Sequence, residues 1–194
     1  ENMDTFSQNL IDTKPTIFFA VPRILTKFKQ GILANMPQKD LEIDLSNPNK
    51  SKLIKNKIQT ALGLEKVRAL ISGAAPLSES LKDWYISIGL PITNGYGMTE
   101  NCAITTILAP SENKTGSVGK AQPRVAIRID NETGEVLMKA PFLMSGYYKR
   151  QDLTDETIID GWLKTGDQGQ IDDEGHLFII GRVKDTFKTS KGKF

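Results

Sequence analysis

The chain has 194 residues, of which 39% are hydrophobic and 25% charged, a composition typical of a globular protein rather than a disordered or fibrous one. Lys and Arg number 25 against 23 Asp and Glu, and the resulting net charge of +2 lacks the basic excess of nucleic-acid-binding proteins. The single Cys excludes an internal disulfide framework and a Cys-based zinc site, and the single His disfavours a Ser-His-Asp triad. No apolar run approaches the roughly 18–20 residues of a membrane span.

The first part of the chain, to about Thr106, has the pattern of an α/β fold. Residues 16–20 form a continuous apolar run, which predicts a strand covered on both faces. Pro22 suits the first turn of a helix, because its missing N–H needs no partner there. Apolar residues at helical spacing over 54–62 predict a further helix.

A β-α-β unit follows. Residues 67–71 predict a strand, Ser78 is a suitable N-cap for the next helix, and residues 90–93 predict a second strand. The strands of such a unit run parallel with a right-handed crossover. The loops 72–76 and 94–100 should therefore leave the same edge of the sheet, where ligands bind in open α/β sheets.

Beyond about residue 113 the pattern changes to period-two segments separated by Gly- and Asp-rich turns. Apolar residues alternate over 125–129 and 136–138 on either side of a turn at 131–134, which predicts a hairpin. A second hairpin is expected from residues 168–171 and 176–180. This part of the chain therefore reads as antiparallel β-sheet.

Short segments carry groups suited to chemistry. Residues 94–100 (Asn-Gly-Tyr-Gly-Met-Thr-Glu) combine glycines that allow a tight turn near a ligand, a stacking ring, a hydroxyl and a carboxylate suited to Mg²⁺. Residues 72–76 have small side chains that leave space for a ligand, and the acidic residue of 163–167 could accept sugar hydroxyls. The basic residues of 181–185 could face phosphates. Taken singly, these segments fit ordinary turns, tight packing or a solvated surface.

Together and in this order, these segments resemble the adenylate-forming superfamily of acyl- and aryl-CoA synthetases, luciferases and peptide-synthetase adenylation domains. The resemblance runs from about Pro15 to Phe194 and includes Gly-Glu-Val-Leu at 134–137 and Gly-Tyr-Tyr at 146–148. Residues 20–23 and the tail at 187–193 look most like bacterial long-chain acyl-CoA synthetases. The implied fold is a parallel β-α-β layer followed by a β-rich, distorted barrel-like subdomain, both part of a large N-terminal domain.

The resemblance implies an adenine site. Tyr96 would stack on the adenine ring, with Gly73 and Ala74 as the opposite wall. Asn94 would hydrogen-bond the adenine amino group, and Gly97 would let the backbone approach the nucleotide.

The resemblance also implies residues for the phosphates, the metal and the ribose. Thr99 would contact the α-phosphate, and Glu100 would help to hold Mg²⁺. Asp167 would accept both ribose hydroxyls, and Arg182 would also reach the ribose. Lys184 would be the hinge about which a small C-terminal domain rotates.

The implied reaction is the ATP-dependent activation of a long-chain fatty acid to acyl-AMP and then to acyl-CoA. ATP, Mg²⁺ and CoA are the expected cofactor and co-substrates, and a fatty acid is the expected substrate. The expected location is the cytoplasm, with peripheral contact at the inner face of the membrane as a further option. Oligomeric state and acyl chain length are not predicted.

Expected subdomains are residues 1–110 (α/β), 111–181 (antiparallel β) and 182–194 (hinge and start of the C-terminal domain). The family's phosphate loop and its C-terminal domain with a catalytic lysine have no counterpart in this sequence. We therefore expect an internal fragment that is inactive on its own.

Two other hypotheses stay open. The chain could belong to an adenylation domain that loads an amino acid onto a carrier protein, although such domains commonly have Pro at the position of Met98. It could also be a non-catalytic nucleotide-binding module. Residues 116–120 (Gly-Ser-Val-Gly-Lys) resemble a Walker loop, but Lys114 and Ala121 stand where that loop needs Gly and Ser or Thr, so we assign them no phosphate role.

Overall fold

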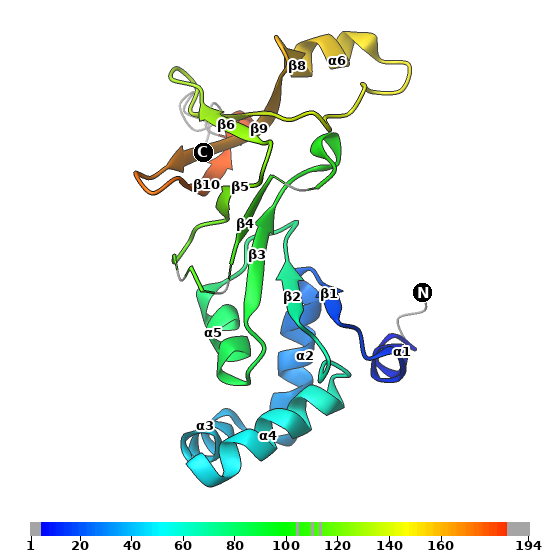
Figure 1. Cartoon of the computed structure of the whole chain (residues 1–194), viewed down its shortest axis with the longest axis vertical. Coiled ribbons are helices and arrows are strands. Elements are labelled where there is room, and N and C mark those ends of the chain that lie inside the picture. The colour runs from blue at the N-terminus through cyan, green and yellow to red at the C-terminus, as the bar shows by residue number, and fades with distance from the viewer. Residues whose placement is uncertain (1–4, 104, 110, 113, 186–194) are drawn as a thin grey trace. The chain divides into compact units, whose positions relative to one another are not determined.

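The structure is a computed structural model that describes residues 5–185 except Ile104, Pro110 and Asn113. It divides into two compact units, residues 1–93 and 94–194, which are shown in Figure 1 and described here separately. The tail at 187–193, which contributed to the resemblance, lies outside the described residues. The subdomain boundaries expected at 110 and 181 stay predictions.

The first unit is a layer of helices with a short parallel pair of strands. Its elements in chain order are α1 (Phe6–Thr13), β1 (Ile17–Phe19), α2 (Pro22–Asn35), α3 (Gln38–Ser46), α4 (Pro48–Ala61), β2 (Ala69–Ser72) and α5 (Glu79–Ser87), followed by the start of β3 (Ile92–Tyr96). β1 and β2 pair in parallel, with Ile17 opposite Ala69. The predicted strands, the helix that begins at Pro22 and the helix that follows Ser78 are confirmed.

An apolar core joins the helices of this unit to its strands. Leu25 of α2 and Tyr85 of α5 are both fully buried, and the Tyr85 hydroxyl donates to the Leu25 carbonyl oxygen at 2.9 Å. This bond satisfies the polar end of a large buried ring, as burial of a tyrosine requires. Trp84 packs edge-on against Tyr85, with ring centroids 4.9 Å apart.

The expectation that β1 is covered on both faces is wrong. Ile17 and Phe19 are 63% and 58% exposed, whereas Phe18 between them packs against Phe6 and Phe28 with centroids 6.5 and 6.3 Å apart. A run of apolar residues this short cannot distinguish a strand with one buried face from a strand with two.

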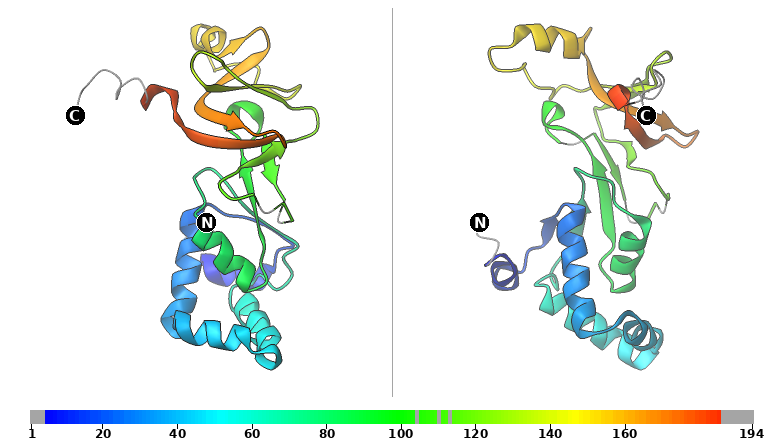
Figure 2. Two further views of the ribbon diagram at one scale, coloured as in Figure 1. Left: turned by 90° about the vertical axis from the view of Figure 1, so that its left-hand side faces the viewer. Right: turned by 180° about the vertical axis from the view of Figure 1, so that it is seen from behind.

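Helices α3 and α4 lie side by side, as both views in Figure 2 show. Asn47 separates them, and its side-chain oxygen accepts a hydrogen bond from the Asn49 backbone N–H at 3.0 Å, as an N-cap does. Lys50, Lys52 and Lys57 of α4 are exposed and Lys55 is half-buried, so the lysines of this helix lie mainly on its solvent side.

The second unit is an antiparallel sheet with little helix. Its elements are the end of β3, a 3₁₀ turn η1 (Thr99–Asn101), β4 (Thr106–Leu108), β5 (Gly119–Ala121), β6 (Ala126–Ile129), β7 (Glu135–Lys139), α6 (Gln151–Thr157), β8 (Ile158–Ile159), β9 (Trp162–Ile171) and β10 (His176–Arg182). The strand order is β3-β4-β5-β10-β9-β7-β6, and β8 pairs with β9. Within the described residues this sheet is open rather than closed into a barrel.

Both predicted hairpins are confirmed. β6 and β7 pair with Ile127 opposite Met138 and Ile129 opposite Val136. β9 and β10 are longer than expected, and β10 ends with Arg182 directly opposite Asp167 of β9. No helix in the described part of the chain is long and apolar enough to cross a membrane.

Candidate functional site

The Asp167 carboxylate is the centre of a hydrogen-bonded group drawn from three strands. The Tyr96 hydroxyl of β3 donates to Asp167 Oδ2 at 2.7 Å. The Arg182 guanidinium of β10 donates to Asp167 Oδ1 at 2.8 Å. The structure therefore brings together three residues that the sequence suggested separately for the adenine and ribose sites.

Two neighbouring groups hold the backbone that carries Asp167. The Thr165 hydroxyl donates to the Val136 carbonyl at 2.8 Å and accepts from the Asp167 backbone N–H at 3.1 Å. The Gly166 N–H donates to Glu135 Oε1 at 2.7 Å, and Gly166 has a φ of +73°, which favours glycine. Glu135 is only 6% exposed and was not identified from the sequence as a site residue.

The electrostatics of this group keep the tyrosine hydroxyl beside Asp167 protonated. Burial, together with the hydrogen bond to Asp167, raises the pKa of the Tyr96 hydroxyl well above its ordinary value. The hydroxyl therefore stays a donor throughout the neutral range. A carboxylate has about four acceptor positions, so Asp167 can accept further hydroxyl donors in addition to Tyr96 and Arg182.

The motif that contains Tyr96 is partly strand and not wholly the expected turn. Asn94, Gly95 and Tyr96 pair with Leu108, Ile107 and Thr106 of β4. Because side chains alternate along a strand, those of Asn94 and Tyr96 share one face. The Asn94 amide nitrogen donates to the Ser117 carbonyl at 3.3 Å. Gly97 follows the strand and leads into η1.

Glu100 lies in η1, next to Thr99, which is exposed. The Tyr147 hydroxyl donates to Glu100 Oε1 at 2.8 Å, and the Met144 N–H donates to the Glu100 carbonyl at 2.8 Å. The bond to Glu100 raises the pKa of Tyr147. Tyr147 belongs to a motif used for the resemblance, but the sequence did not identify it as a site residue.

A close contact positions Tyr147. The backbone N–H of Tyr147 donates to Thr154 Oγ1 at 2.9 Å. A Cβ atom on Gly146, which has a φ of +149°, would lie 2.9 Å from the same Thr154 oxygen. A side chain at position 146 would therefore displace the Thr154 side chain, so glycine suits this position.

The groups around Glu100 suit a magnesium ion that is bound jointly by the protein and by substrate phosphates, rather than one bound by protein groups alone. Among the described residues, no group of three or more His, Cys, Asp or Glu side chains is arranged to hold a metal. Mg²⁺ is usually held by one or two carboxylates together with substrate phosphates and water. Glu100 fits the part of such a single carboxylate ligand.

The remaining predicted site residues lie elsewhere in the chain. Gly73 and Ala74 follow β2 in the first unit, and Ala74 has a left-handed φ of +65°. Their role as a wall of the adenine site stays a prediction. Residues 183–185 are helical and Lys184 is exposed, and its role as a hinge also stays a prediction.

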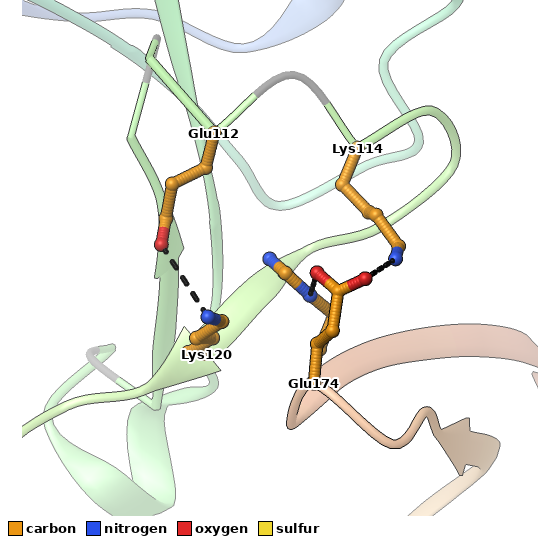
Figure 3. Close-up of a pocket in the computed structure, with 5 residues that line it drawn as sticks. Glu112, Lys114, Lys120 and Glu174 are labelled. Atoms are coloured by element: carbon orange, nitrogen blue, oxygen red, sulfur yellow. Dashed lines mark hydrogen bonds and ion pairs between the residues drawn. The ribbon is translucent and has the colours of Figure 1, made fainter.

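A second polar cluster lies in the second unit and forms a hollow of about 250 Å³ (Figure 3). Its lining residues are Glu112, Lys114, Lys120, Glu174 and His176. Lys114 pairs with Asp172 at 3.0 Å and with Glu174 at 2.9 Å, and Lys120 pairs with Glu112 at 3.7 Å. These charges compensate one another, so the cluster serves to hold the segment before β5 against the β9–β10 turn.

Comparison with known sequences finds one matching family and relatives with similar names. The profile of a family described as AMP-binding enzyme matches residues 2–148. Long chain acyl-CoA synthetase 3 of Arabidopsis thaliana is 32% identical over 96% of this chain and 33% of that protein. Long-chain-fatty-acid–CoA ligase FadD15 of Mycobacterium tuberculosis is 39% identical over 73% of this chain and 23% of that protein.

Solved structures of a coenzyme A synthetase and of a related N-terminal domain have a fold similar to that of this chain. O-succinylbenzoate coenzyme A synthetase of Bacillus subtilis, in complex with ATP and a magnesium ion, matches with a TM-score of 0.70 and 26% identity over 95% of this chain and 35% of that chain. The inhibitor-bound N-terminal domain of FACL13 from Mycobacterium tuberculosis matches with a TM-score of 0.69 and 26% identity over 94% of this chain and 42% of that domain. The chain spans about a third of the length of the Arabidopsis relative.

Proposed function

The chain belongs to the AMP-binding enzyme family, and we propose on that basis that it forms the nucleotide-binding part of an ATP-dependent acyl-CoA synthetase. The longer protein that carries it in this proposal is called the parent protein below. The observation that carries the proposal is the hydrogen-bonded group of Tyr96, Asp167 and Arg182, which combines an aromatic ring with a carboxylate suited to ribose hydroxyls.

The proposed substrate is a long-chain fatty acid. The names of the relatives, long chain acyl-CoA synthetase and long-chain-fatty-acid–CoA ligase, support this class of acid. In the first step a carboxylate oxygen attacks the α-phosphorus of ATP, which forms acyl-AMP and releases pyrophosphate. In the second step the CoA thiol attacks the acyl carbon, and AMP leaves.

The nucleoside half of the site binds ATP and contributes no chemistry. Tyr96 stacks on adenine, with Gly73 and Ala74 as the opposing wall and Gly97 allowing close approach of the backbone. Asn94 accepts from the adenine amino group.

The ribose binds at the Asp167 carboxylate, which also accepts the hydrogen bond from the Tyr96 hydroxyl. Asp167 accepts both ribose hydroxyls, which its free acceptor positions allow. Arg182 holds the Asp167 carboxylate and also reaches the ribose. This part of the site fixes the nucleotide, so that the α-phosphate lies beyond the end of β3.

The phosphate half of the site meets the charge that develops during adenylation. Thr99 contacts the α-phosphate through its hydroxyl, and Glu100 is a ligand of Mg²⁺, which supplies charge stabilisation at the phosphates when it is bound. Tyr147 orients the Glu100 carboxylate by its hydrogen bond of 2.8 Å. Positioning and charge stabilisation of this kind supply most of the rate enhancement in such transfers.

Further parts of the reaction belong to the parent protein. Lys184 is the hinge about which a small C-terminal domain turns between the two steps. We also propose a cytoplasmic location, with peripheral contact at the inner membrane face.

An amino-acid adenylation domain is the second candidate. The Met at position 98, where such domains commonly carry Pro, favours the fatty-acid activity. The test is ATP–pyrophosphate exchange by the parent protein with a panel of long-chain fatty acids, short acids and amino acids. Exchange that depends on long-chain fatty acids and is followed by acyl-CoA formation is expected. Exchange that depends on an amino acid, or nucleotide binding without exchange, would contradict the proposal.

A further inference from the structure

The side-chain amide of Asn94 has a defined orientation in this structure. Its nitrogen donates to the Ser117 carbonyl at 3.3 Å. A carbonyl oxygen only accepts, so the amide nitrogen and not the amide oxygen must face it. The oxygen Oδ1 is thereby turned to the opposite side of the amide, on the strand face that Asn94 shares with Tyr96.

The Ser117 carbonyl is itself held firmly. Ser117 is 2% exposed, and its hydroxyl donates to the Leu177 carbonyl of β10 at 3.0 Å. The same hydroxyl accepts from the Gly119 N–H at 2.9 Å, and the Ser117 N–H donates to the Lys114 carbonyl at 3.2 Å. Each polar group of Ser117 therefore has a partner. The three hydrogen bonds that fix its position, to Leu177, Gly119 and Lys114, do not involve Asn94.

The neighbouring backbone adds to this anchor. The Val118 N–H donates to the Leu177 carbonyl at 2.9 Å, so one carbonyl of β10 receives two bonds from the segment. Gly119 has a φ of +95°, and a Cβ atom there would overlap the backbone of Ile107. The small residues of segment 116–120 therefore let the backbone approach β4 and β10 closely. This close approach fixes the position of the Ser117 carbonyl oxygen.

From these contacts we infer that Ser117 is a positioning residue that makes the nucleotide site select a 6-amino purine over a 6-oxo purine. The inference rests on the proposed function, in which the purine stacks on Tyr96 beside Asn94. The 6-amino group of adenine donates, whereas the 6-oxo group of hypoxanthine or guanine accepts. An amide locked with Oδ1 toward the base accepts from the amino group and repels the oxo group.

The alternative orientation of the amide is disfavoured by the same carbonyl. If Asn94 flipped to donate to a 6-oxo purine, Oδ1 would face the Ser117 oxygen and two acceptors would meet without a hydrogen between them. An unpaired or repelled polar group at such a site weakens binding on the order of 10-fold to 100-fold. Discrimination therefore depends on a residue that does not touch the base.

The test compares three nucleotides in the parent protein. ATP carries a 6-amino group, inosine triphosphate a 6-oxo group, and purine riboside triphosphate only hydrogen at that position. We expect wild-type KM values to rise in the order ATP, purine riboside triphosphate, inosine triphosphate. Ser117→Ala should reduce the ATP preference over inosine triphosphate by about 10-fold and leave the KM for purine riboside triphosphate and the kcat for ATP within about 2-fold.

A matched control separates positioning from loop stability. The Thr106 hydroxyl donates to the Val118 carbonyl at 2.6 Å, next to Ser117, and contacts neither Ser117 nor Asn94 through that bond. Thr106→Val should lower thermal stability without changing the ratio of KM values for ATP and inosine triphosphate. If Ser117→Ala and Thr106→Val affect all three nucleotides equally, Ser117 is merely structural and the inference is overturned.

A second variant keeps the test decisive if Ser117→Ala does not fold. Ser117→Cys has nearly the same side-chain size, but its thiol is only a weak donor to the Leu177 carbonyl and a weak acceptor for the Gly119 N–H. We expect the preference for ATP over inosine triphosphate to fall by about 5-fold in this variant, because the Ser117 carbonyl is held less firmly. An unchanged preference in Ser117→Cys would overturn the inference. Absence of any fatty-acid-dependent exchange by the wild type would instead contradict the proposed function.

Discussion

The Tyr147 hydroxyl donates to Glu100 Oε1 at 2.8 Å and so links two motifs whose residues are 47 positions apart in the chain. A carboxylate held in this way is oriented before a ligand arrives. Tyr147→Phe removes only the donor. We expect adenylation by the parent protein to slow by about 5- to 10-fold, the effect of one hydrogen bond worth about 1 kcal/mol, and the Mg²⁺ concentration for half-maximal rate to rise.

Tyr148→Phe is the matched control for this prediction. Tyr148 is adjacent in the sequence but 86% exposed, so loss of its hydroxyl should leave both the rate and the Mg²⁺ requirement unchanged. Equal behaviour of the two variants would show that the hydroxyl of Tyr147 does not orient Glu100.

Glu100 itself carries a larger expected effect. Glu100→Gln keeps the size of the side chain and an oxygen that can accept from Tyr147, but it removes the charge. The loss in adenylation rate should be of order 10²-fold or more, comparable to removal of a preorganised electrostatic group. The measurement is the rate of acyl-AMP formation across a Mg²⁺ titration. Near-normal activity of the variant at limiting Mg²⁺ would remove Glu100 from the metal site.

Asp167→Ala should weaken ATP binding with little effect on the fatty acid. Two hydrogen bonds from ribose to a charged acceptor are lost, at a cost of about 3 kcal/mol or more. The variant also leaves the half-buried Tyr96 hydroxyl without this acceptor, which lies 2.7 Å away in the structure. Calorimetric titrations with ATP and with fatty acid measure the two affinities separately. An unchanged ATP affinity would show that Asp167 lies outside the nucleotide site.

The patterns of single elements were readable from the sequence, whereas contacts between distant segments were not. Alternation of apolar and polar residues predicts the β6–β7 hairpin correctly, because its turn lies only a few residues from both strands. By contrast, the roles of Glu135 and Ser117 depend on partners 31 and 23 positions away, and nothing local to either residue indicates them. Such pairings arise from strand order, which a single sequence does not encode locally.

Helix α3 shows a misleading local pattern. Leu41, Ile43 and Leu45 alternate with acidic residues, which is a strand-like period, yet residues 38–46 are helical. The helix buries Leu41 and leaves Ile43 66% exposed, so packing of one turn against the core overrides the alternation. At β3 the expectation of a loop from residue 94 was wrong, because pairing with β4 extends the strand to Tyr96.

Asp172 makes the stability of the second unit sensitive to acid. Desolvation opposes ionisation there, but the His176 backbone N–H and the Lys114 ammonium outweigh it and lower the pKa of Asp172 to about 2. An unfolded aspartate has a pKa of about 3.9. The ionised group therefore stabilises the fold fully above about pH 4, and this contribution is lost as pH falls from about 4 to 2.

The variant that isolates this charge is Asp172→Asn. Its oxygen can still accept from the N–H groups of Glu174 and His176, which lie 3.0 and 2.9 Å from Asp172 Oδ1. Urea unfolding at several pH values should give a free-energy difference between wild type and variant that is constant above pH 5 and shrinks toward pH 2. A difference independent of pH would mean that the turn geometry, and not the charge, supplies the stability.

The last prediction concerns Lys184 and the movement between the two chemical steps. Residues 183–185 are helical and follow directly after β10, whose final residue Arg182 is held by Asp167. A hinge at this point would let a C-terminal domain turn while the ribose contact stays in place. Rotation of a domain requires a few residues that absorb a large change in φ and ψ. Proline fixes φ near −65°, a value that a helical residue already has, so Lys184→Pro is compatible with the arrangement described here but restricts departure from it.

We expect this variant of the parent protein to slow one of the two steps much more than the other. If the described arrangement is the adenylating one, acyl-AMP formation survives and transfer to CoA falls sharply. Lys184→Ala removes the same ammonium group but leaves φ free, so it should spare both steps more than the proline variant does. Single-turnover measurements of acyl-AMP formation and of its reaction with CoA separate the steps. Equal slowing of both steps by proline, or no slowing of either, would count against Lys184 as the hinge.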